Sequence, residues 1–217
     1  MDKGTVIVIG AGPGLGLAVA NAFAKLGYPI ALIARNKESL QKVAEQLTNS
    51  APKVGVYSAD AGDPEKLKAA LQQAVNELGE PEVMVYNASV LAPDRPTELS
   101  AEEFTARLVV DMVGAKVATD TIVPLLRSGH GTLLFTGGGF GLNPLPDFTS
   151  ISVGKAALRA YVLALFQDMR EKGVHASTIT IFGTIGEPGF EPDKIAESYV
   201  RLHLQQPDEW AAEIQIT

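Results

Sequence analysis

The sequence predicts an α/β fold in which a doubly wound parallel sheet of about seven strands carries helices on both faces. Short runs of β-branched and apolar residues alternate along the 217 residues with longer segments of helical period, as in parallel β-α-β units. The first run, Thr5 to Ile9, is entirely β-branched, which suits a strand buried on both faces. No linker, low-complexity tract or short-period repeat interrupts residues 1–217, so we expect a single domain.

The first strand leads directly into a glycine-rich turn and a helix. Gly10, Gly14 and Gly16 have the spacing G-x-x-x-G-x-G, and the Ala- and Leu-rich segment 17–26 predicts the helix. The spacing G-x-G-x-x-G fails because residue 15 is leucine. A strand, a glycine turn and a helix together aim backbone N–H groups and a helix N-terminus at a phosphate. The plainer alternative is a glycine-rich turn without a ligand.

The remaining elements follow from the same patterns. Asp63 before Pro64 is typical of a helix cap and first helical position. Ser100, followed by Glu102 and Glu103, is typical of a second capped helix. We expect strands at 29–34, 53–58, 82–86, 131–136, 174–182 and 213–216, helices at 37–49, 63–78, 100–126, 149–171 and 192–206, and a loop at 137–146.

Composition narrows the possible functions. The 25 acidic and 18 basic residues argue against a nucleic-acid partner, which favours a basic face. The absence of cysteine excludes disulfides and thiolate catalysis. We expect no membrane-spanning run and no signal peptide before the first strand, and therefore a cytoplasmic protein. His130, His175 and His203 lack metal-ligand spacing, so we expect no metal site.

Further motifs extend the pattern of the glycine turn along nearly the whole chain. Asp60 follows the third expected strand, Tyr86-Asn87-Ala88-Ser89 follows the fourth, and Lys155 precedes Ala-Ala-Leu. Together with the glycine spacing, these motifs resemble the short-chain dehydrogenase/reductase family, which has a Rossmann-type fold and binds nicotinamide dinucleotides. The resemblance implies an oxidoreductase for a small carbonyl or alcohol substrate and a homodimer or homotetramer. The family usually places its substrate loop between the sixth and last strands, and because that section (183–210) is short here, we expect the substrate side of the site to be open or completed by a neighbouring subunit.

The residues after the second expected strand indicate which dinucleotide binds. A site that prefers NAD(H) usually places a carboxylate there for the ribose hydroxyls, whereas this chain has Ala34-Arg35-Asn36. An arginine can pair with a 2′-phosphate in bidentate fashion, so we expect NADP(H) to bind more tightly than NAD(H). A solvated arginine at a helix start is the alternative. The cofactor-binding set that the resemblance implies is Gly10, Pro13, Gly14, Leu15, Gly16, Arg35, Asp60, Ala61, Asn87, Ala88 and Lys155.

Three of these residues have individual roles in the family. Asp60 would contact the adenine ring, although it could instead cap the helix that starts near Asp63. Asn87 would tie neighbouring loops together through its amide, and Ala88 would leave space for the ribose.

The catalytic positions depart from the family pattern. The family places a tyrosine four residues before its lysine, or seven in the enoyl reductases, and this chain has Ile151 and Phe148 there. The usual serine position holds Gly138 and the usual asparagine position holds Asp111. Isoleucine, phenylalanine and glycine cannot give a proton to the oxygen of a reduced carbonyl. Lys155 and Asp111 therefore remain as catalytic candidates, although Asp111 could pair with Lys155 or be a solvated helix residue.

Nearby hydroxyl groups are alternative proton donors. Thr136 would share a strand face with residue 138 if the strand continued, and Thr149, Ser150 and Ser152 lie near a helix start. Aliphatic hydroxyls are poor acids and more often bond the local backbone. Two functions stay open: an atypical NADP(H)-dependent oxidoreductase in which the substrate or a water supplies the proton, and a catalytically silent NADP(H)-binding redox sensor or partner subunit.

Overall fold

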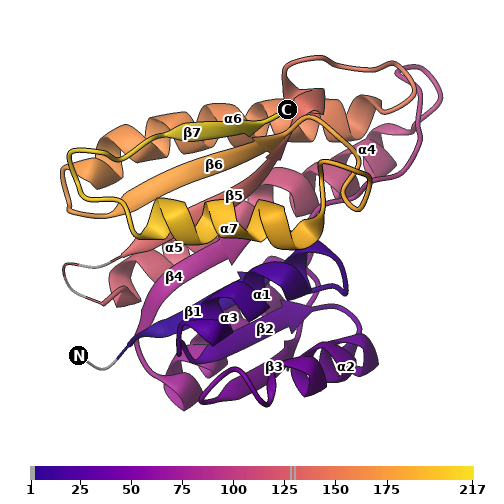
Figure 1. The fold of residues 1–217 in the computed structure, drawn as a ribbon. Coiled ribbons are helices and arrows are strands. Elements are labelled where there is room, and N and C mark those ends of the chain that lie inside the picture. Colours follow the sequence, from indigo (N-terminus) through magenta and orange to yellow (C-terminus); the bar gives the residue numbers. More distant parts are fainter. Residues whose placement is uncertain (1–2, 128, 130) are drawn as a thin grey trace.

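The computed structural model describes residues 3–127, 129 and 131–217 and contains one seven-stranded parallel sheet in the order β3-β2-β1-β4-β5-β6-β7. Helices lie on both faces of this sheet (Figure 1), which confirms the predicted fold class. The strands are β1 (Thr5–Ile9), β2 (Ile30–Ala34), β3 (Val54–Ser58), β4 (Pro81–Tyr86), β5 (Thr132–Gly138), β6 (His175–Ile181) and β7 (Glu213–Ile216). The α-helices are α1 (Leu15–Lys25), α2 (Lys37–Leu47), α3 (Pro64–Leu78), α4 (Ala101–Leu108), α5 (Gly114–Ile122), α6 (Thr149–Arg170) and α7 (Pro192–His203).

The sheet separates two apolar cores, and β1 contributes to both. All five β1 residues are buried between β2 and β4. Val6 and Val8 face the core under α1, α2 and α7, whereas Ile7 and Ile9 face the core under α3, α5 and α6. Each fully buried aliphatic side chain of this kind stabilises the fold by about 1.5–3 kcal/mol. The uniform β-branched run is therefore the signature of a strand with helices on both sides.

Two helix starts have the caps that the sequence predicts. The Asp63 side chain accepts a hydrogen bond from the backbone N–H of Lys66, and Pro64 is the first residue of α3. Ser100 and Glu103 form a reciprocal capping box at the start of α4. These caps fix where the chain turns from the loops at the carboxyl ends of the strands into the helices.

Two boundaries near the glycines differ from the sequence prediction. α1 starts at Leu15 rather than residue 17, because Leu15 and Gly16 are buried and the backbone N–H of Leu17 donates to the Gly12 carbonyl. β5 continues through residues 137 and 138, where a loop was expected, because both residues pair with β6. A Cβ at residue 137 would lie 2.7 Å from Oγ1 of Thr178, so glycine is needed to fit this strand against its neighbour.

The single helix expected at 100–126 is interrupted. Between α4 and α5 lies a π-helical segment, Val109–Val113, and after α5 a short 3₁₀ turn, Val123–Leu125. A π-helical turn inserts an extra residue into the helix and re-aims the side chains near it, and such turns are frequent at functional sites. Asp111 is the buried residue of this segment. Helical periodicity alone did not predict the interruption.

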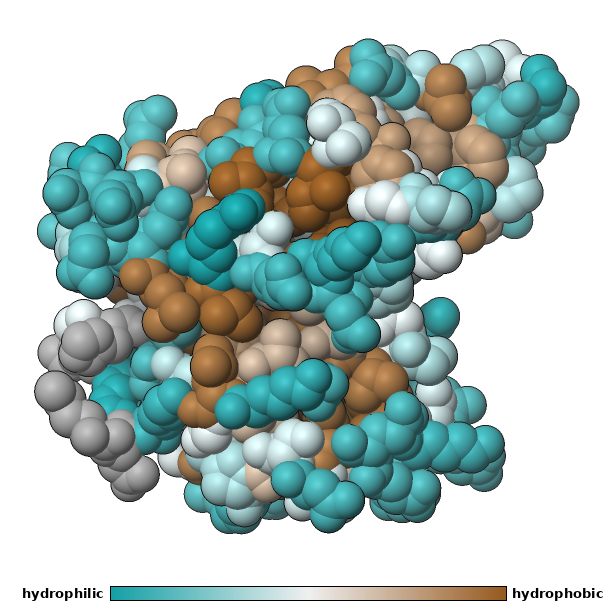
Figure 2. All heavy atoms as spheres, in the orientation of Figure 1, coloured by the Kyte–Doolittle hydropathy of each residue, from teal (hydrophilic) through white to brown (hydrophobic). Residues whose placement is uncertain are grey.

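The longest helix, α6, is long and apolar enough by length and composition to cross a membrane, which the sequence prediction did not anticipate. In the structure its buried residues Leu158, Val162 and Met169 belong to the core beneath the sheet. On the face that α7 covers, polar side chains cover much of the surface and apolar ones gather over β6 and β7 (Figure 2). β7 is the edge strand there, and its Ile214 and Ile216 are half-buried.

A buried polar cluster lies at the amino-terminal edge of the sheet. Glu82 accepts hydrogen bonds from the Tyr28 hydroxyl at 3.1 Å and from the Gly4 N–H at 2.8 Å, and it lies 3.5 Å from Nε2 of His203. Burial tends to raise the pKa of Glu82, but the hydrogen bonds from His203, Gly4 and Tyr28 outweigh it and hold the pKa at about 2. The carboxylate is therefore more stable in the folded chain than in the unfolded one.

This lowered pKa predicts an acid-dependent stability. The ionised Glu82 stabilises the fold above its ordinary pKa of 4.5, and this contribution is lost as the pH falls toward 2. Glu82→Gln should therefore lower the free energy of unfolding near neutral pH, and the gap to wild type should close in acid. Urea unfolding at about pH 7, 4.5 and 3 measures the gap, with exposed Glu80→Gln as the control. A gap that stays constant with pH would contradict the prediction.

Candidate functional site

The glycine turn after β1 combines two crowded glycines with two open ones. Gly10 has φ of +85°, and a Cβ there would lie 2.5 Å from the backbone N of Ala88. A Cβ at Gly16 would lie 2.5 Å from the carbonyl oxygen of Gly10. At Gly12 and Gly14 an added Cβ would meet nothing within 4 Å. Two glycines thus close the turn against its neighbours, and the other two leave space before the N-terminus of α1, where an anion is favoured.

A cleft of about 230 Å³ opens at the carboxyl ends of the strands next to this turn. In a doubly wound sheet, ligands bind at such an edge where the strand order reverses, which here is between β1 and β4. Its lining includes Gly10, Arg35, Asp60, Ala61, Asn87 and Ala88 from the predicted set. It also includes residues that the sequence prediction missed: Ile9, Gly12, Ile33, Ala34, Ala59, Ser89, Val90 and Val110.

Some predicted cofactor residues lie outside this cleft. Pro13 and Gly14 line a second hollow, which they share with Asp193 at the start of α7. Leu15 is buried and its side chain packs in the core under α1, so only its backbone faces the turn. Gly16 is buried at the closure of the turn.

The residues that follow β2 and β3 present one cation and one anion to the cleft. Arg35 is exposed, and no acidic side chain in the described part of the chain forms an ion pair with it. Asn36 caps α2, so the Arg35 side chain is not needed to start that helix. Asp60 accepts a hydrogen bond from the Gly62 N–H at 2.8 Å. Because Asp63 caps α3, the alternative of Asp60 as that cap is wrong.

Asn87 joins three segments at the centre of the site, as predicted. Its Nδ2 donates to the carbonyl of Gly10 at 2.9 Å, and its Oδ1 accepts from Oγ1 of Thr136 at 2.9 Å. The Thr136 carbonyl in turn accepts a hydrogen bond from Nζ of Lys155 at 2.7 Å. A continuous set of contacts therefore connects the glycine turn to the lysine on α6.

Asp111 and Lys155 are both buried and lie close enough to influence each other. Asp111 is 1% exposed, and its Oδ1 accepts a hydrogen bond from the Val90 N–H at 2.9 Å. Burial raises the pKa of Asp111 to about 6, against the opposing effects of the Val90 N–H and of Lys155 and Arg107. Burial lowers the pKa of Lys155 to about 8, and the Asp111 carboxylate opposes this. The alternative of Asp111 as a solvated residue is therefore wrong.

The positions of the family tyrosine and serine are apolar or empty. Ile151, one turn before Lys155, is 1% exposed. Phe148 packs against Phe140 with ring centroids 5.5 Å apart. Gly138 carries no side chain, and a Cβ there would lie 3.6 Å from Cγ of Lys155. The Lys155 side chain thus borders the space that a serine would fill.

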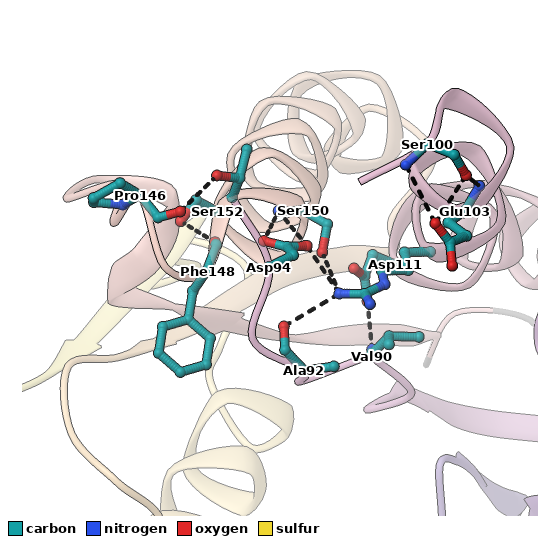
Figure 3. Close-up of polar contacts among 12 residues, drawn as sticks. Val90, Ala92, Asp94, Ser100, Glu103, Asp111, Pro146, Phe148, Ser150 and Ser152 are labelled. Atoms are coloured by element: carbon teal, nitrogen blue, oxygen red, sulfur yellow. Dashed lines mark hydrogen bonds and ion pairs between the residues drawn. The ribbon is translucent and has the colours of Figure 1, made fainter. Parts of the chain in front are cut away.

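A tie that the sequence prediction missed holds the loop after β4 against the start of α6 (Figure 3). Both carboxylate oxygens of Asp94 accept from the backbone N–H of Ser150, at 3.1 and 3.2 Å. Nη1 of Arg107 donates to Asp94 at 2.8 Å and to the Ala92 carbonyl at 3.2 Å. The negative charge of the Asp94 carboxylate also stabilises the N-terminus of α6. This tie fixes the first turn of the helix that carries Lys155.

Among the described residues, no group of three or more His, Asp or Glu side chains is placed so that it could hold a metal ion. His130 lies outside the described residues. Both ring nitrogens of His175 lie within 3.1 Å of backbone carbonyl oxygens, and its ring stacks on Trp210. His203 belongs to the polar cluster around Glu82. These two histidines thus serve the packing of α7 and the C-terminal segment.

Comparison with known proteins agrees with this geometry. Residues 4–185 match the family described as short chain dehydrogenase. An uncharacterized oxidoreductase of Staphylococcus aureus is 26% identical over 217 residues, covering 95% of this chain and 92% of the relative. One from Mycobacterium tuberculosis is 28% identical over 163 residues, which cover 74% of this chain and 62% of that relative, so this chain spans less than two thirds of it.

A solved structure resembles the fold over nearly its full length. It is an alcohol dehydrogenase from the archaeon Thermococcus sibiricus in complex with 5-hydroxy-NADP, 26% identical, with a TM-score of 0.87 over 99% of this chain and 96% of that one. The chain therefore belongs to the short-chain dehydrogenase family. Membership confirms the resemblance and supports the expected class, an NAD(P)-dependent oxidoreductase.

Proposed function

We propose that this short-chain dehydrogenase binds NADP(H) at the carboxyl edge of its sheet and interconverts a small carbonyl compound and its alcohol. One observation carries the proposal: Gly12 of the glycine turn, which has open space beside it, and the exposed Arg35 line the same cleft. A turn of backbone N–H groups suits a pyrophosphate, and a guanidinium suits a 2′-phosphate. The bound dinucleotide would supply or accept the hydride.

The chain's own residues fit the remaining parts of such a ligand. Asp60 and Ala61, which follow β3, line the cleft where the adenine would bind. Asn87 hydrogen-bonds to both the glycine turn and β5 and so holds them together. Ala88 lies so close to Gly10 that the backbone of both segments forms one wall. Lys155 is not one of the residues that line the cleft, but it donates a hydrogen bond to the Thr136 carbonyl and would contact the ribose. These proposed roles depend on where each residue lies in the fold as well as on its residue type.

A second candidate function is an NADP(H)-binding redox sensor or partner subunit without turnover. The observation that favours it is the absence of a hydroxyl at Ile151, Phe148 and Gly138. Ile151, Phe148 and Gly138 do not line the cleft, so the usual acid is missing while the lining of the cleft is kept. The two candidates share the binding site and differ only in chemistry.

Calorimetric titration followed by a substrate panel tests both candidates. We expect NADPH to bind and NADPH to be consumed with at least one member of a panel of aldehydes, ketones and quinones. Lys155→Ala should abolish that consumption. Binding without consumption of NADPH would favour the sensor, and absence of NADPH binding would overturn both candidates.

Assembly and location complete the proposal. We expect a homodimer or homotetramer, supported by the family resemblance, and a cytoplasmic location. The half-buried edge strand β7 and the apolar residues gathered beside it agree with a contact between copies (Figure 2).

A further inference from the structure

The space beside Lys155 lacks the proton donor that carbonyl reduction requires. Ile151, one turn earlier on α6, is apolar and 1% exposed. Gly138 at the end of β5 offers no side chain, and a Cβ there would lie 3.6 to 3.9 Å from three methylene carbons of Lys155. A side chain at residue 138 would therefore be in van der Waals contact with the lysine, and glycine leaves this contact unmade.

Three of the four neighbouring hydroxyl groups that the sequence indicates already donate their protons elsewhere, and the fourth, that of Ser150, accepts a hydrogen bond from Nη1 of Arg107 at 3.3 Å. Oγ1 of Thr136 donates to Oδ1 of Asn87 at 2.9 Å. The hydroxyls of Thr149 and Ser152 donate to backbone carbonyls three and four residues earlier, at 3.0 and 2.7 Å (Figure 3). A hydroxyl has one proton to donate, so transfer to a substrate would break each of these bonds. The prediction that such hydroxyls bond the local backbone holds for Thr149 and Ser152.

Lys155, by contrast, has donor capacity left. An ammonium carries three N–H groups, and among the described residues Nζ of Lys155 donates one hydrogen bond, to the Thr136 carbonyl. The Asp111 carboxylate packs against the preceding residue: a Cβ at Gly154 would lie 2.7 Å from its Oδ2. This Oδ2 is buried and has no hydrogen-bond partner among the described residues. An unpaired carboxylate oxygen thus faces α6 beside the lysine.

We infer that Lys155 is the proton donor of this site, and that Asp111 is the positioning residue that maintains its charge. The inference rests on the proposed NADP(H)-dependent reduction and names the acid for it. Lys155 would then touch the reacting oxygen, whereas Asp111 acts only through Lys155.

The transfer balances without any further reactant. In the reducing direction a bound NADPH would supply the hydride to the carbonyl carbon, becoming NADP⁺, and the π electrons of the C=O bond would move to oxygen. The oxygen would take a proton from Nζ of Lys155, so that the carbonyl becomes an alcohol. Lys155 is left as a neutral amine, which regains a proton from solvent. In the oxidising direction the neutral amine accepts the alcohol proton.

The electrostatics of the site suit this role. Burial brings the pKa of Lys155 down to about 8, and a general acid works best when its pKa is close to the working pH. The charged group that acts on Lys155 is Asp111 on the π-helical segment, and Arg107 on α4 acts on Asp111. Burial and, after it, the Asp111 carboxylate raise the pKa of Tyr86 on β4. Asp111 raises the pKa of Lys155, so its removal should lower that pKa further.

A titration of the lysine itself tests the inference without activity. The protein carries ¹³C at lysine Cε, and the NMR signal that disappears in Lys155→Arg identifies Lys155. We expect its midpoint at about 8 in wild type and lower in Asp111→Asn. A Lys155 midpoint near the ordinary lysine value of 10.5, or one that Asp111→Asn leaves in place, would overturn the inference.

Turnover variants separate proton donation from charge. Lys155→Arg keeps a cation but cannot release a proton near neutral pH, so it should lower kcat by about 10²- to 10⁴-fold, as Lys155→Ala does, while NADPH binding persists. Near-normal turnover in Lys155→Arg would overturn the inference and leave the proposed function standing. Failure of wild type to bind NADPH would instead overturn the proposed function. The NMR titration would still test whether Lys155 has the lowered pKa that the inference requires. Lys42→Arg on the exposed face of α2 is the matched control.

Discussion

Gly10→Ala is expected to destabilise the protein more than alanine at any other glycine of the turn. Gly10 has φ of +85°, which costs an alanine about 1–2 kcal/mol. Its Cβ would also lie 2.5 to 2.8 Å from backbone atoms of residues 87 and 88, which cannot move aside as a flexible side chain would. Overpacking of this kind adds about 1–3 kcal/mol, so the total reaches about 3 kcal/mol of a typical 5–15.

Three other glycines separate the two causes of this loss. Gly27 has φ of +83° and open space around it, so Gly27→Ala measures strain alone. Gly16 has a clash at 2.5 Å without a positive φ, so Gly16→Ala measures crowding alone. Gly12→Ala has neither and should change stability by about 0.5 kcal/mol or less. Denaturant unfolding of the four variants gives the free energies, and a loss at Gly10 no larger than at Gly27 would contradict the role of crowding.

These glycines also show which features of the site could be predicted from the sequence. The spacing of residues 10, 14 and 16 located the turn, because a tight turn between a buried strand and a helix needs glycine. It did not distinguish the crowded positions from the open ones, since crowding at Gly10 comes from Ala88, 78 residues later in the chain. Gly12 was missed for the same reason: its open surroundings depend on the tertiary arrangement and leave no local pattern.

The fold was more predictable than the site. Strand and helix positions follow from local periodicity and caps, as at Asp63 and Ser100, whereas the π-helical turn at Asp111 gives no periodic signal. The burial of Asp111 and Lys155, and thus their altered pKa values, arises from packing between α6 and the interrupted helix. The Asp94–Arg107 tie joins a loop to two helices and likewise has no local signature.

The apolar residues of the cleft were missed for another reason. Ile33 lies within β2, Ala59 follows β3 directly and Val90 lies in the loop after β4, and an apolar residue at such positions looks like a continuation of the core. Polar residues at the same edge, such as Arg35 and Asp60, stand out because they break that pattern. Sequence reasoning therefore finds the groups that select a ligand more readily than the walls that enclose it.

Arg35→Asp is expected to reverse the preference between the two dinucleotides. In wild type the guanidinium would form charge-assisted hydrogen bonds with the 2′-phosphate of NADPH, each worth about 1.5–3 kcal/mol. Aspartate removes these bonds and repels the phosphate, so NADPH affinity should fall by about 100-fold or more. NADH affinity should hold or rise, because a carboxylate at the end of β2 can accept hydrogen bonds from the ribose hydroxyls.

The measurement is a pair of calorimetric titrations, with NADPH and with NADH, on wild type and each variant. Lys42→Asp makes the same change of charge on the exposed face of α2, away from the residues that line the cleft, and should leave the preference unchanged. Because the Arg35 contribution is that of an exposed charge, added salt should weaken NADPH binding more than NADH binding in wild type and not in Arg35→Asp. Equal affinities for NADPH and NADH in wild type would contradict the assignment of Arg35 as the selecting residue. If Lys42→Asp had the same NADPH and NADH affinities as Arg35→Asp, the change in preference would be an effect of net charge alone.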